Sequence, residues 1–483
     1  MNQAIRNTWI IAIAMFALLF GSLTVVQFFE ADNLNANDWN SRTLYKDFDK
    51  NRGAILVAGN PIAESVPSSD DEFEFQRRYN EPELYGPLTG FYSLVYGATQ
   101  MESAMNEELS GSSNDFFYDR ILQLFSGSQV AGASVELTID PELQKLAYDL
   151  LPDGVKGSIV VMEPKTGNIL AMVSKPSFDP NQLAGHNTDD VAANMAKLEE
   201  VPGLSPFTNP ATESLLAPGS VFKLVDTAAA LESGKYDENS KLDNPAELPL
   251  PGTNTSLPNF VNGGCSAQTT ADFSFALEQS CNTPFAQIAM DLGEDAIADQ
   301  AAKFGFGESF NIPTNVTASQ FPTGMSDDLL AQAAIGQYDV RVTPLQVAMM
   351  TSAIANDGVL MKPNLVRTVR APDLRVLDSP KPEELQRSLS AENAQLIQQW
   401  MVNAVDRGIA NRAAIPGVKV AGKTGTAELL AGSEGNNSWF TGFAPADDPQ
   451  AVVSVVIEDV DLATGSQLTS PSARQLLEAV LNK

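Results

Sequence analysis

A serine and a lysine one helical turn apart are the first residues in this sequence whose types and spacing could do chemistry. Ser220 and Lys223 lie in the segment APGSVFKL, in which a Pro-Gly turn precedes an apolar helical pattern. The pattern predicts that Ser220 begins a helix and that Lys223 lies on the same face one turn later. Backbone N–H groups at a helix start can hold an oxyanion, and a lysine can act as a base when burial or a second cation favours its neutral form. Because S-x-x-K also arises by chance in a chain of this composition, the pair alone is weak evidence for a nucleophile.

Two further motifs strengthen this interpretation. Ser280-Cys281-Asn282 follows a helical run, and Lys423-Thr424-Gly425-Thr426 follows an alternating strand pattern. A serine could relay a proton to a leaving amine, an asparagine could hold a substrate amide, and a lysine could supply fixed positive charge beside an anionic ligand. A glycine in the last motif would let the strand approach the ligand closely. The candidate catalytic residues are therefore Ser220, Lys223, Ser280, Asn282 and Lys423, and the candidate substrate-binding residues are Thr424, Gly425 and Thr426.

The single histidine, His186, excludes most other kinds of site. A metal site built on several imidazoles is impossible, and a Ser-His-Asp triad would have to use His186 itself. Its polar Gly and Asn context instead predicts a surface loop. We therefore expect no metal and no cofactor.

Two segments imitate functional motifs. Lys165-Thr166-Gly167 is a second K-T-G, but it precedes Ser220 and follows a proline, so we interpret it as the turn of a hairpin. The segment 417–424, GVKVAGKT, fits the phosphate-loop pattern, with an acidic strand pattern at 452–459. A phosphate loop needs a strand before it and a helix directly after it, whereas Val418 to Val420 alternate like a strand within the loop itself, so a nucleotide site is disfavoured.

Charge and hydropathy place most of the chain outside a membrane. From Thr8 to Phe29 there is no charged residue, and this length of helix spans a bilayer. A cleaved signal peptide is the alternative, but no A-x-A site follows. Arg6 precedes the span and Glu30 follows it, so the positive-inside rule predicts a cytoplasmic N-terminus, a single-pass anchor in the cell membrane and an extracytoplasmic catalytic domain. The net charge of -30 argues against a nucleic-acid partner.

The only two cysteines, Cys265 and Cys281, would both lie on the outer side, where disulfides persist. A bridge between them is therefore possible, and we favour it over two buried thiols. The sequence does not give the distance between them.

The remaining patterns predict an α+β fold in three parts. Residues 1–29 would form the cytoplasmic tip and anchor, 30–133 a small membrane-proximal domain, and 134–483 a large C-terminal domain. In the large domain a sheet would be covered by helices. The expected strands are 157–162 and 169–173 as a hairpin, then 418–426, 438–443 and 451–458; the expected helices are 141–151, 222–231, 273–292, 345–355 and 471–481.

Taken together, these motifs resemble the class B penicillin-binding proteins, and within them the actinobacterial penicillin-binding protein A group. The resemblance extends over nearly the whole chain, and its further segments are Asn51 to Leu56, Arg78-Tyr79, Tyr85 to Gly90, Leu137 to Asp140, Gly336-Gln337 and Thr343 to Gln346. It implies a serine β-lactamase/transpeptidase-like domain, with an antiparallel sheet and helices on both sides, on a small pedestal or dimerisation domain. The large domain would cross-link peptidoglycan stem peptides of a lipid-linked precursor and would be acylated by β-lactams. Ser220 would be the nucleophile and Lys223 the base.

By the same resemblance, the backbone N–H groups of Ser220 and Thr426 would form the oxyanion hole, and Thr424 and Thr426 would bind the carboxylate of the peptide or drug. About 100 residues between anchor and catalytic domain are too few for a glycosyltransferase, so we expect one activity and a separate membrane glycosyltransferase as the partner polymerase.

Three alternatives stay open at this point. A class A β-lactamase needs a deacylating glutamate between S-x-N and K-T-G, and no glutamate occurs between Glu308 and Glu383. A D,D-carboxypeptidase differs mainly in its acceptor and is harder to separate from a transpeptidase. A non-catalytic penicillin-binding scaffold of the cell-wall machinery is the alternative of another class.

Overall fold

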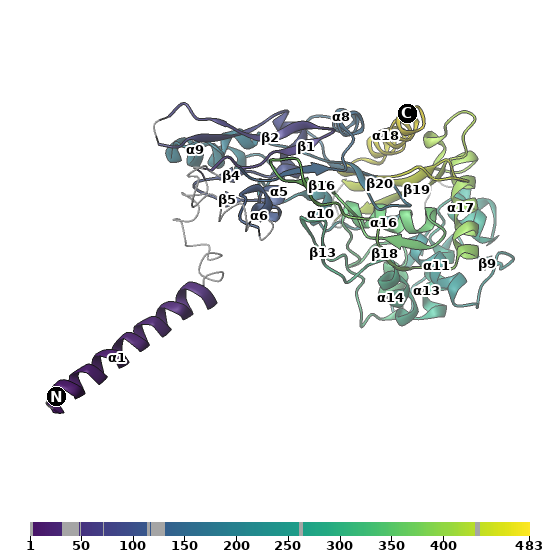
Figure 1. Cartoon of the computed structure of the whole chain (residues 1–483). Coiled ribbons are helices and arrows are strands. Elements are labelled where there is room, and N and C mark those ends of the chain that lie inside the picture. The colour runs from purple at the N-terminus through teal and green to yellow at the C-terminus, as the bar shows by residue number, and fades with distance from the viewer. Residues whose placement is uncertain are drawn as a thin grey trace.

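The computed structural model describes residues 3–30, 48, 50–70, 72–113, 116, 131–259, 264–429 and 435–483. A long N-terminal helix stands apart from the folded remainder of the chain (Figure 1). This helix, α1 (Gln3–Thr24), continues as a π-helical turn over Val25–Phe29. The stretch Ile5–Phe28 has a mean hydropathy of 2.4 in its most apolar window, and none of that window is buried. Its length and composition are those of a membrane-spanning helix.

The membrane-proximal part is built on a six-stranded sheet in the order β17-β16-β6-β1-β2-β3. Strand β1 pairs antiparallel with β2 and parallel with β6, and β6 pairs antiparallel with β16. Strands from the segment after residue 133 therefore complete a sheet that the earlier segment begins, and the predicted boundary at 133/134 falls inside this sheet. The strands are β1 (Ile55–Val57), β2 (Asn60–Pro67), β3 (Phe75–Tyr79), β6 (Ser134–Leu137), β16 (Val366–Arg370) and β17 (Val376–Asp378).

A buried ion cluster lies beside this sheet. The carboxylate of Glu102, in α5 (Gln100–Ala104), lies 2.6 Å from Nε of Arg52 and 2.6 Å from Nε of Arg77. The hydroxyl of Tyr79 also donates to it at 3.1 Å. These three charged residues are at most 4% exposed. Burial raises the pKa of Glu102, but the two guanidinium groups outweigh burial, so the net pKa is lowered and the carboxylate stays charged.

The catalytic-domain sheet has five strands, all antiparallel, in the order β19-β20-β21-β7-β8. Successive residues of a strand point to opposite faces. In β7, Val160 packs into the same cluster as Met349 of α16 (Pro344–Ala355), whereas Ile159 packs into the cluster that holds Leu143 of α8. Both faces are therefore covered by helices, as predicted. The strands are β19 (Ala421–Glu428), β20 (Asn436–Ala444), β21 (Ala451–Val460), β7 (Lys156–Met162) and β8 (Ile169–Lys175).

Helices α8 (Pro141–Leu150) and α18 (Leu462–Leu481) cover one face of this sheet, and α16 covers the other (Figure 1). The prediction that the last helix starts at Pro471 is wrong. The helix starts nine residues earlier, where the side chain of Asp461 caps it by accepting hydrogen bonds from Ala463 and Thr464, and Pro471 lies inside it.

The predicted helix 273–292 is also wrong as one element, because residues 279–282 separate α12 (Phe273–Glu278) from α13 (Thr283–Leu292). The other main helices are α4 (Pro82–Thr89), α6 (Asn106–Leu109), α9 (Thr188–Glu199), α10 (Pro210–Glu213), α11 (Lys223–Glu232), α14 (Glu294–Lys303), α15 (Asp327–Ala333) and α17 (Ala391–Asp406). Short strand pairs connect them, namely β4 (Tyr92–Ser93) with β5 (Gly97–Ala98), β9 (Leu242–Asp243) with β12 (Thr270–Ala271), β10 (Glu247–Pro249) with β11 (Ser256–Pro258), β13 (Phe310–Asn311) with β14 (Asn315–Val316), and β15 (Val359–Met361) with β18 (Glu384–Arg387).

Candidate active site

Ser220 lies in a tight turn that presses against the edge strand of the catalytic sheet. The turn is a 3-10 helix over Gly219–Val221, directly before α11. Gly219 has φ +54°, and a Cβ on it would lie 2.3 Å from the carbonyl oxygen of Thr426. Any other residue would collide with β19 and strain the backbone, so glycine is what brings the Ser220 turn against the K-T-G strand.

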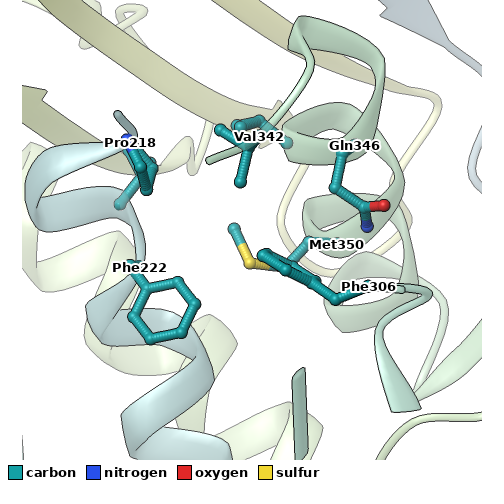
Figure 2. A pocket seen from close by; sticks show the side chains of 8 residues that line it. Pro218, Phe222, Phe306, Val342, Gln346 and Met350 are labelled. Atoms are coloured by element: carbon teal, nitrogen blue, oxygen red, sulfur yellow. The ribbon is translucent and has the colours of Figure 1, made fainter. Parts of the chain in front are cut away.

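An apolar seam behind this turn holds it in place. Figure 2 shows Pro218 and Phe222 facing Val342, Met350 and Phe306 across a narrow gap. The gap leaves no room for a water molecule. Because interiors packed this closely resist displacement, the seam fixes the position of Ser220 and is not itself a ligand site.

A second glycine, Gly336, contacts the Ser220 turn on its other side. The N–H of Gly219 donates to the carbonyl of Gly336 at 3.0 Å. Gly336 has φ +71°, and a Cβ on it would lie 2.0 Å from the carbonyl oxygen of Gly219. Tyr338, two residues later, has φ +57° and lines the same cleft as Ser220 with 45% of its surface exposed. Sequence reasoning did not single out Tyr338, because no local pattern marks a tyrosine for this conformation.

Lys223 is fully buried one turn after Ser220. Its Nζ donates to the carbonyl oxygen of Ser280 at 2.8 Å and to Oδ1 of Asn282 at 2.8 Å. Burial lowers the pKa of Lys223 far below its ordinary value, and the positive charge of Lys423 lowers it further. A neutral amine is therefore favoured, as a base requires. In the part of the chain that the structure describes, no hydrogen bond joins the Ser220 hydroxyl to this amine.

Asp226 lies one turn further along the same helix and was missed from sequence. It is 0% exposed, and among the described residues neither of its carboxyl oxygens has a hydrogen-bond partner. Burial raises its pKa well above the ordinary value, although the charge of Lys223 acts in the opposite direction. Burial thus favours the neutral form of Asp226 over the carboxylate that would offset the charge of the lysine.

The S-x-N motif occupies the break between α12 and α13. Ser280 has φ +56°, a left-handed conformation that ends the first helix and turns its side chain toward the two lysines. The Asn282 side chain also donates to the carbonyl of Pro258 at 2.9 Å. Between these two residues, Cys281 forms a disulfide with Cys265, with a Cα–Cα distance of 5.6 Å. The catalytic loop is therefore tied to the short 3-10 helix Gly264–Ala267.

Lys423, on the edge strand β19, completes the polar centre. Its Nζ donates to Oγ of Ser280 at 2.7 Å and to the carbonyl of Thr424 at 2.8 Å. Burial lowers its pKa to about 7. Burial thus opposes the fixed positive charge that the sequence predicts for this lysine. The strand pattern did not show the depth at which this residue lies.

The strand residues after Lys423 face the cleft. Thr424, Gly425 and Thr426 line a cavity of about 910 Å³ together with Ser220, Ser280 and Asn282. A Cβ on Gly425 would lie 2.8 Å from the carbonyl oxygen of Pro218, so this glycine also lets the Ser220 turn approach the strand. Six of the eight predicted residues thus line one cleft. The other two, Lys223 and Lys423, are buried beside it and contact Ser280.

The segments that imitate functional motifs lie elsewhere or fold differently. Lys165-Thr166-Gly167 forms the turn of the β7–β8 hairpin, as predicted, and Lys165 pairs with Asp448 at 2.6 Å. The phosphate-loop pattern runs into β19, which pairs antiparallel with β20, so no helix follows it and the nucleotide reading fails.

The surface prediction for His186 is wrong. His186 does lie in a loop, but its side chain is only 8% exposed, packs against the rings of Phe73 and Phe48, and pairs with Asp70. Contacts with the membrane-proximal part cover it, and the local sequence could not show those contacts.

Comparisons with known proteins identify the family of this chain. The model of the penicillin-binding protein transpeptidase domain matches residues 157–478, and that of the penicillin-binding protein A dimerisation domain matches residues 52–135. The chain is 37% identical over its full length to the peptidoglycan D,D-transpeptidase PbpA of Mycolicibacterium smegmatis, covering 100% of each chain, and 37% identical to that of Mycobacterium tuberculosis, covering 100% of this chain and 99% of the relative. A ceftriaxone acyl-enzyme complex of penicillin-binding protein A from M. tuberculosis superposes with a TM-score of 0.85 at 36% identity, covering 90% of this chain and 100% of that one. The chain that holds this cleft therefore belongs to the class B penicillin-binding proteins.

Proposed function

We propose that this protein is a peptidoglycan D,D-transpeptidase that cross-links stem peptides through an acyl-enzyme on Ser220. One observation carries the proposal. Ser220, Ser280, Asn282 and the threonines of β19 line one cleft, and two buried lysines donate to Ser280 beneath it. Relatives named D,D-transpeptidase share 37% of their residues with this chain over its full length, and the solved relative from M. tuberculosis forms acyl-enzymes with β-lactams.

The acylation step uses each of these groups. Oγ of Ser220 attacks the carbonyl carbon of the penultimate D-alanine while its proton passes to the neutral amine of Lys223. The oxyanion that forms accepts hydrogen bonds from the backbone N–H groups of Ser220 and Thr426. When the C–N bond to the terminal D-alanine breaks, Ser280 passes a proton from a lysine to the leaving amine.

The terminal carboxylate binds between Lys423, Thr424 and Thr426. A carboxylate beside Lys423 favours the protonated amine, so substrate binding restores the charge that burial opposes. A bound carboxylate therefore strengthens the positive charge of Lys423.

Transfer to an amine is favoured over hydrolysis because the described lining of the cleft offers no carboxylate base for water near Ser220. Among the described residues that line the cleft, Glu428 is the only carboxylate, and it lies at the far end of β19. An acceptor amine of a second stem peptide is a stronger nucleophile than water and does not need a carboxylate base.

Labelling with a fluorescent penicillin tests the nucleophile. We expect one label per wild-type chain and none in Ser220→Ala, while Ser214→Ala, a serine outside the cleft lining, labels normally. A Ser220→Ala protein that is folded and still labelled would contradict the proposal. Counting cross-links made from lipid-linked precursor and a polymerase then separates a transpeptidase from a D,D-carboxypeptidase, which would trim the peptides without joining them.

The setting in the membrane is a further part of the proposal. The apolar helix α1 would anchor the chain once, with the catalytic domain outside, because Arg6 precedes the span and Glu30 follows it. A transpeptidase acts on glycan strands that a polymerase supplies, so we propose a membrane glycosyltransferase as partner. Protease added to intact spheroplasts should digest the large domain if this orientation holds.

The proposed division of the chain is an anchor over 1–29, a membrane-proximal domain over 30–133 and a catalytic domain over 134–483. The extents of the two matched family domains, 52–135 and 157–478, support it.

A further inference from the structure

The cleft-facing side of β19 continues beyond the K-T-G motif to a carboxylate. Along this strand Lys423, Gly425 and Ala427 are buried, whereas Thr424 and Thr426 are half-buried and Glu428 is exposed. This alternation puts Thr424, Thr426 and Glu428 on one side of the strand. At about 3.3 Å per residue, Glu428 lies about 7 Å beyond Thr426. All three residues line the cavity that contains Ser220.

Glu428 lies at one end of the cleft lining, with two asparagines and two exposed leucines. Leu429 and Leu462 line the same end of the cleft and are 39% and 40% exposed. In the described ranges, the Glu428 carboxylate forms no ion pair. An exposed carboxylate beside exposed leucines is complementary to an aliphatic chain that ends in a cation, as a lysine side chain does.

The proposed function also fixes the direction in which the donor peptide lies, and this step rests on it. In that direction, the side chain of the residue before the two D-alanines comes to the Glu428 end of the cleft. The terminal carboxylate is held at Lys423 and Thr424, and the scissile carbonyl lies at Ser220. The residues that precede the scissile bond must then extend along β19 away from Lys423, toward Glu428. We propose that Glu428 is a specificity-determining residue that selects donor stem peptides in which the residue before the two D-alanines carries a side chain ending in an ammonium group.

Two penicillins with the same six-carbon acyl side chain, one ending in a free amine and one in its acetamide, test the inference. We expect the full-length wild-type protein to react about three to five times faster with the amine, the range of an exposed ion pair. Added salt should reduce this preference. In Glu428→Gln the two rate constants should become equal.

Glu384→Gln is the matched control, because it removes the same charge from the exposed strand β18, outside the cleft. It should keep the wild-type preference. Equal rates in the wild type, or a preference that survives in Glu428→Gln, would overturn the inference while leaving Ser220 as the nucleophile. If neither penicillin labels Ser220 in the wild type, the proposed function fails, and the inference fails with it.

Discussion

The membrane-proximal part and the catalytic cleft both bury charged side chains, but they do so in opposite ways. Near the membrane, Arg52 and Arg77 share the carboxylate of Glu102, so opposite charges meet at 2.6 Å. In the cleft, Lys223 and Lys423 share Ser280, and their protonated forms have charges of the same sign. The first cluster keeps its groups charged, whereas the second lowers the pKa of both lysines.

The difference separates a structural role from a chemical one. A buried charge that is fully paired holds the chain in one geometry, and removal of one partner leaves the other uncompensated. Buried lysines without a counter-ion cost stability, but the same environment makes their amines able to accept a proton. Substitutions in the two clusters should therefore have opposite consequences for stability and activity.

The largest expected effect is the loss of acylation in Lys223→Met. Removal of a general base should reduce the rate of reaction with a fluorescent penicillin by about 10²–10⁴-fold. The free energy of unfolding should stay the same or increase, because an apolar side chain of similar length replaces a buried amine. Urea unfolding followed in parallel checks the second part, and a variant that loses stability along with activity would break the contrast between the clusters.

In Glu102→Gln we expect the reverse. Two buried guanidinium groups would lose their counter-ion, which should cost about 3–5 kcal/mol of unfolding free energy, while the folded fraction should acylate at the wild-type rate. Because the folded pKa of Glu102 is lowered, its contribution is present above its unfolded value of 4.5 and is lost as pH falls below it. The difference in unfolding free energy between the wild type and Glu102→Gln, measured by urea titration, should therefore become smaller at acidic pH.

Glu64→Gln is the control for that prediction. Glu64 pairs with Arg78 at 2.6 Å in the same sheet, but the two side chains are 26% and 54% exposed. Its loss should cost about 0–1 kcal/mol. A cost as large as that of Glu102→Gln would show that burial does not distinguish the two pairs.

A smaller effect, with a defined pH dependence, is expected for Lys423→Met. The folded pKa of Lys423 is about 7 and its ordinary value is 10.5, so the unfolded chain binds more protons between these values. Wild-type stability therefore rises with pH over this window. The variant should be more stable by about 1–4 kcal/mol at pH 7, and unfolding curves at a series of pH values should show that gain shrinking toward pH 10.5. A gain that grows with pH would mean that the amine is stabilised in its charged form.

The smallest effect is expected for Asp226→Asn. Since burial favours the neutral form of Asp226, its amide analogue should remove little charge. The acylation rate should stay within about twofold, well below the 10²–10⁴-fold loss of a true acid or base, and the acidic limb of its pH profile should not move. An ionised Asp226 would instead raise the pKa of Lys223, so a limb that moves to lower pH in the variant would contradict this assignment.

Local patterns predicted the catalytic sheet well, because strand alternation and turn chemistry are encoded by neighbouring residues. The hairpin of β7 and β8 is confirmed, and β19 starts three residues later than predicted. Helix boundaries were less predictable. The apolar run 273–292 suggested one helix, but the left-handed Ser280 divides it, and only contacts with the lysines explain that conformation.

The candidate site was predicted from the order of three motifs along the chain, not from the number of residues between them. Ser220 and Ser280 are 60 residues apart and Thr424 lies far beyond both, so their meeting in one cleft follows from the fold. Asp226, Tyr338 and the Arg52–Glu102–Arg77 cluster could not be predicted, because each acquires its character from burial or from a partner distant in sequence.

The Cys265–Cys281 bridge makes the S-x-N motif sensitive to the redox state of its surroundings. Cys281 is the middle residue of that motif, so reduction of the bridge would leave the motif held by non-covalent contacts alone. Disulfides persist in oxidising compartments. In the proposed orientation, with the catalytic domain outside the cell, the exported chain would therefore hold this covalent tie, whereas a newly made chain in the cytoplasm would not.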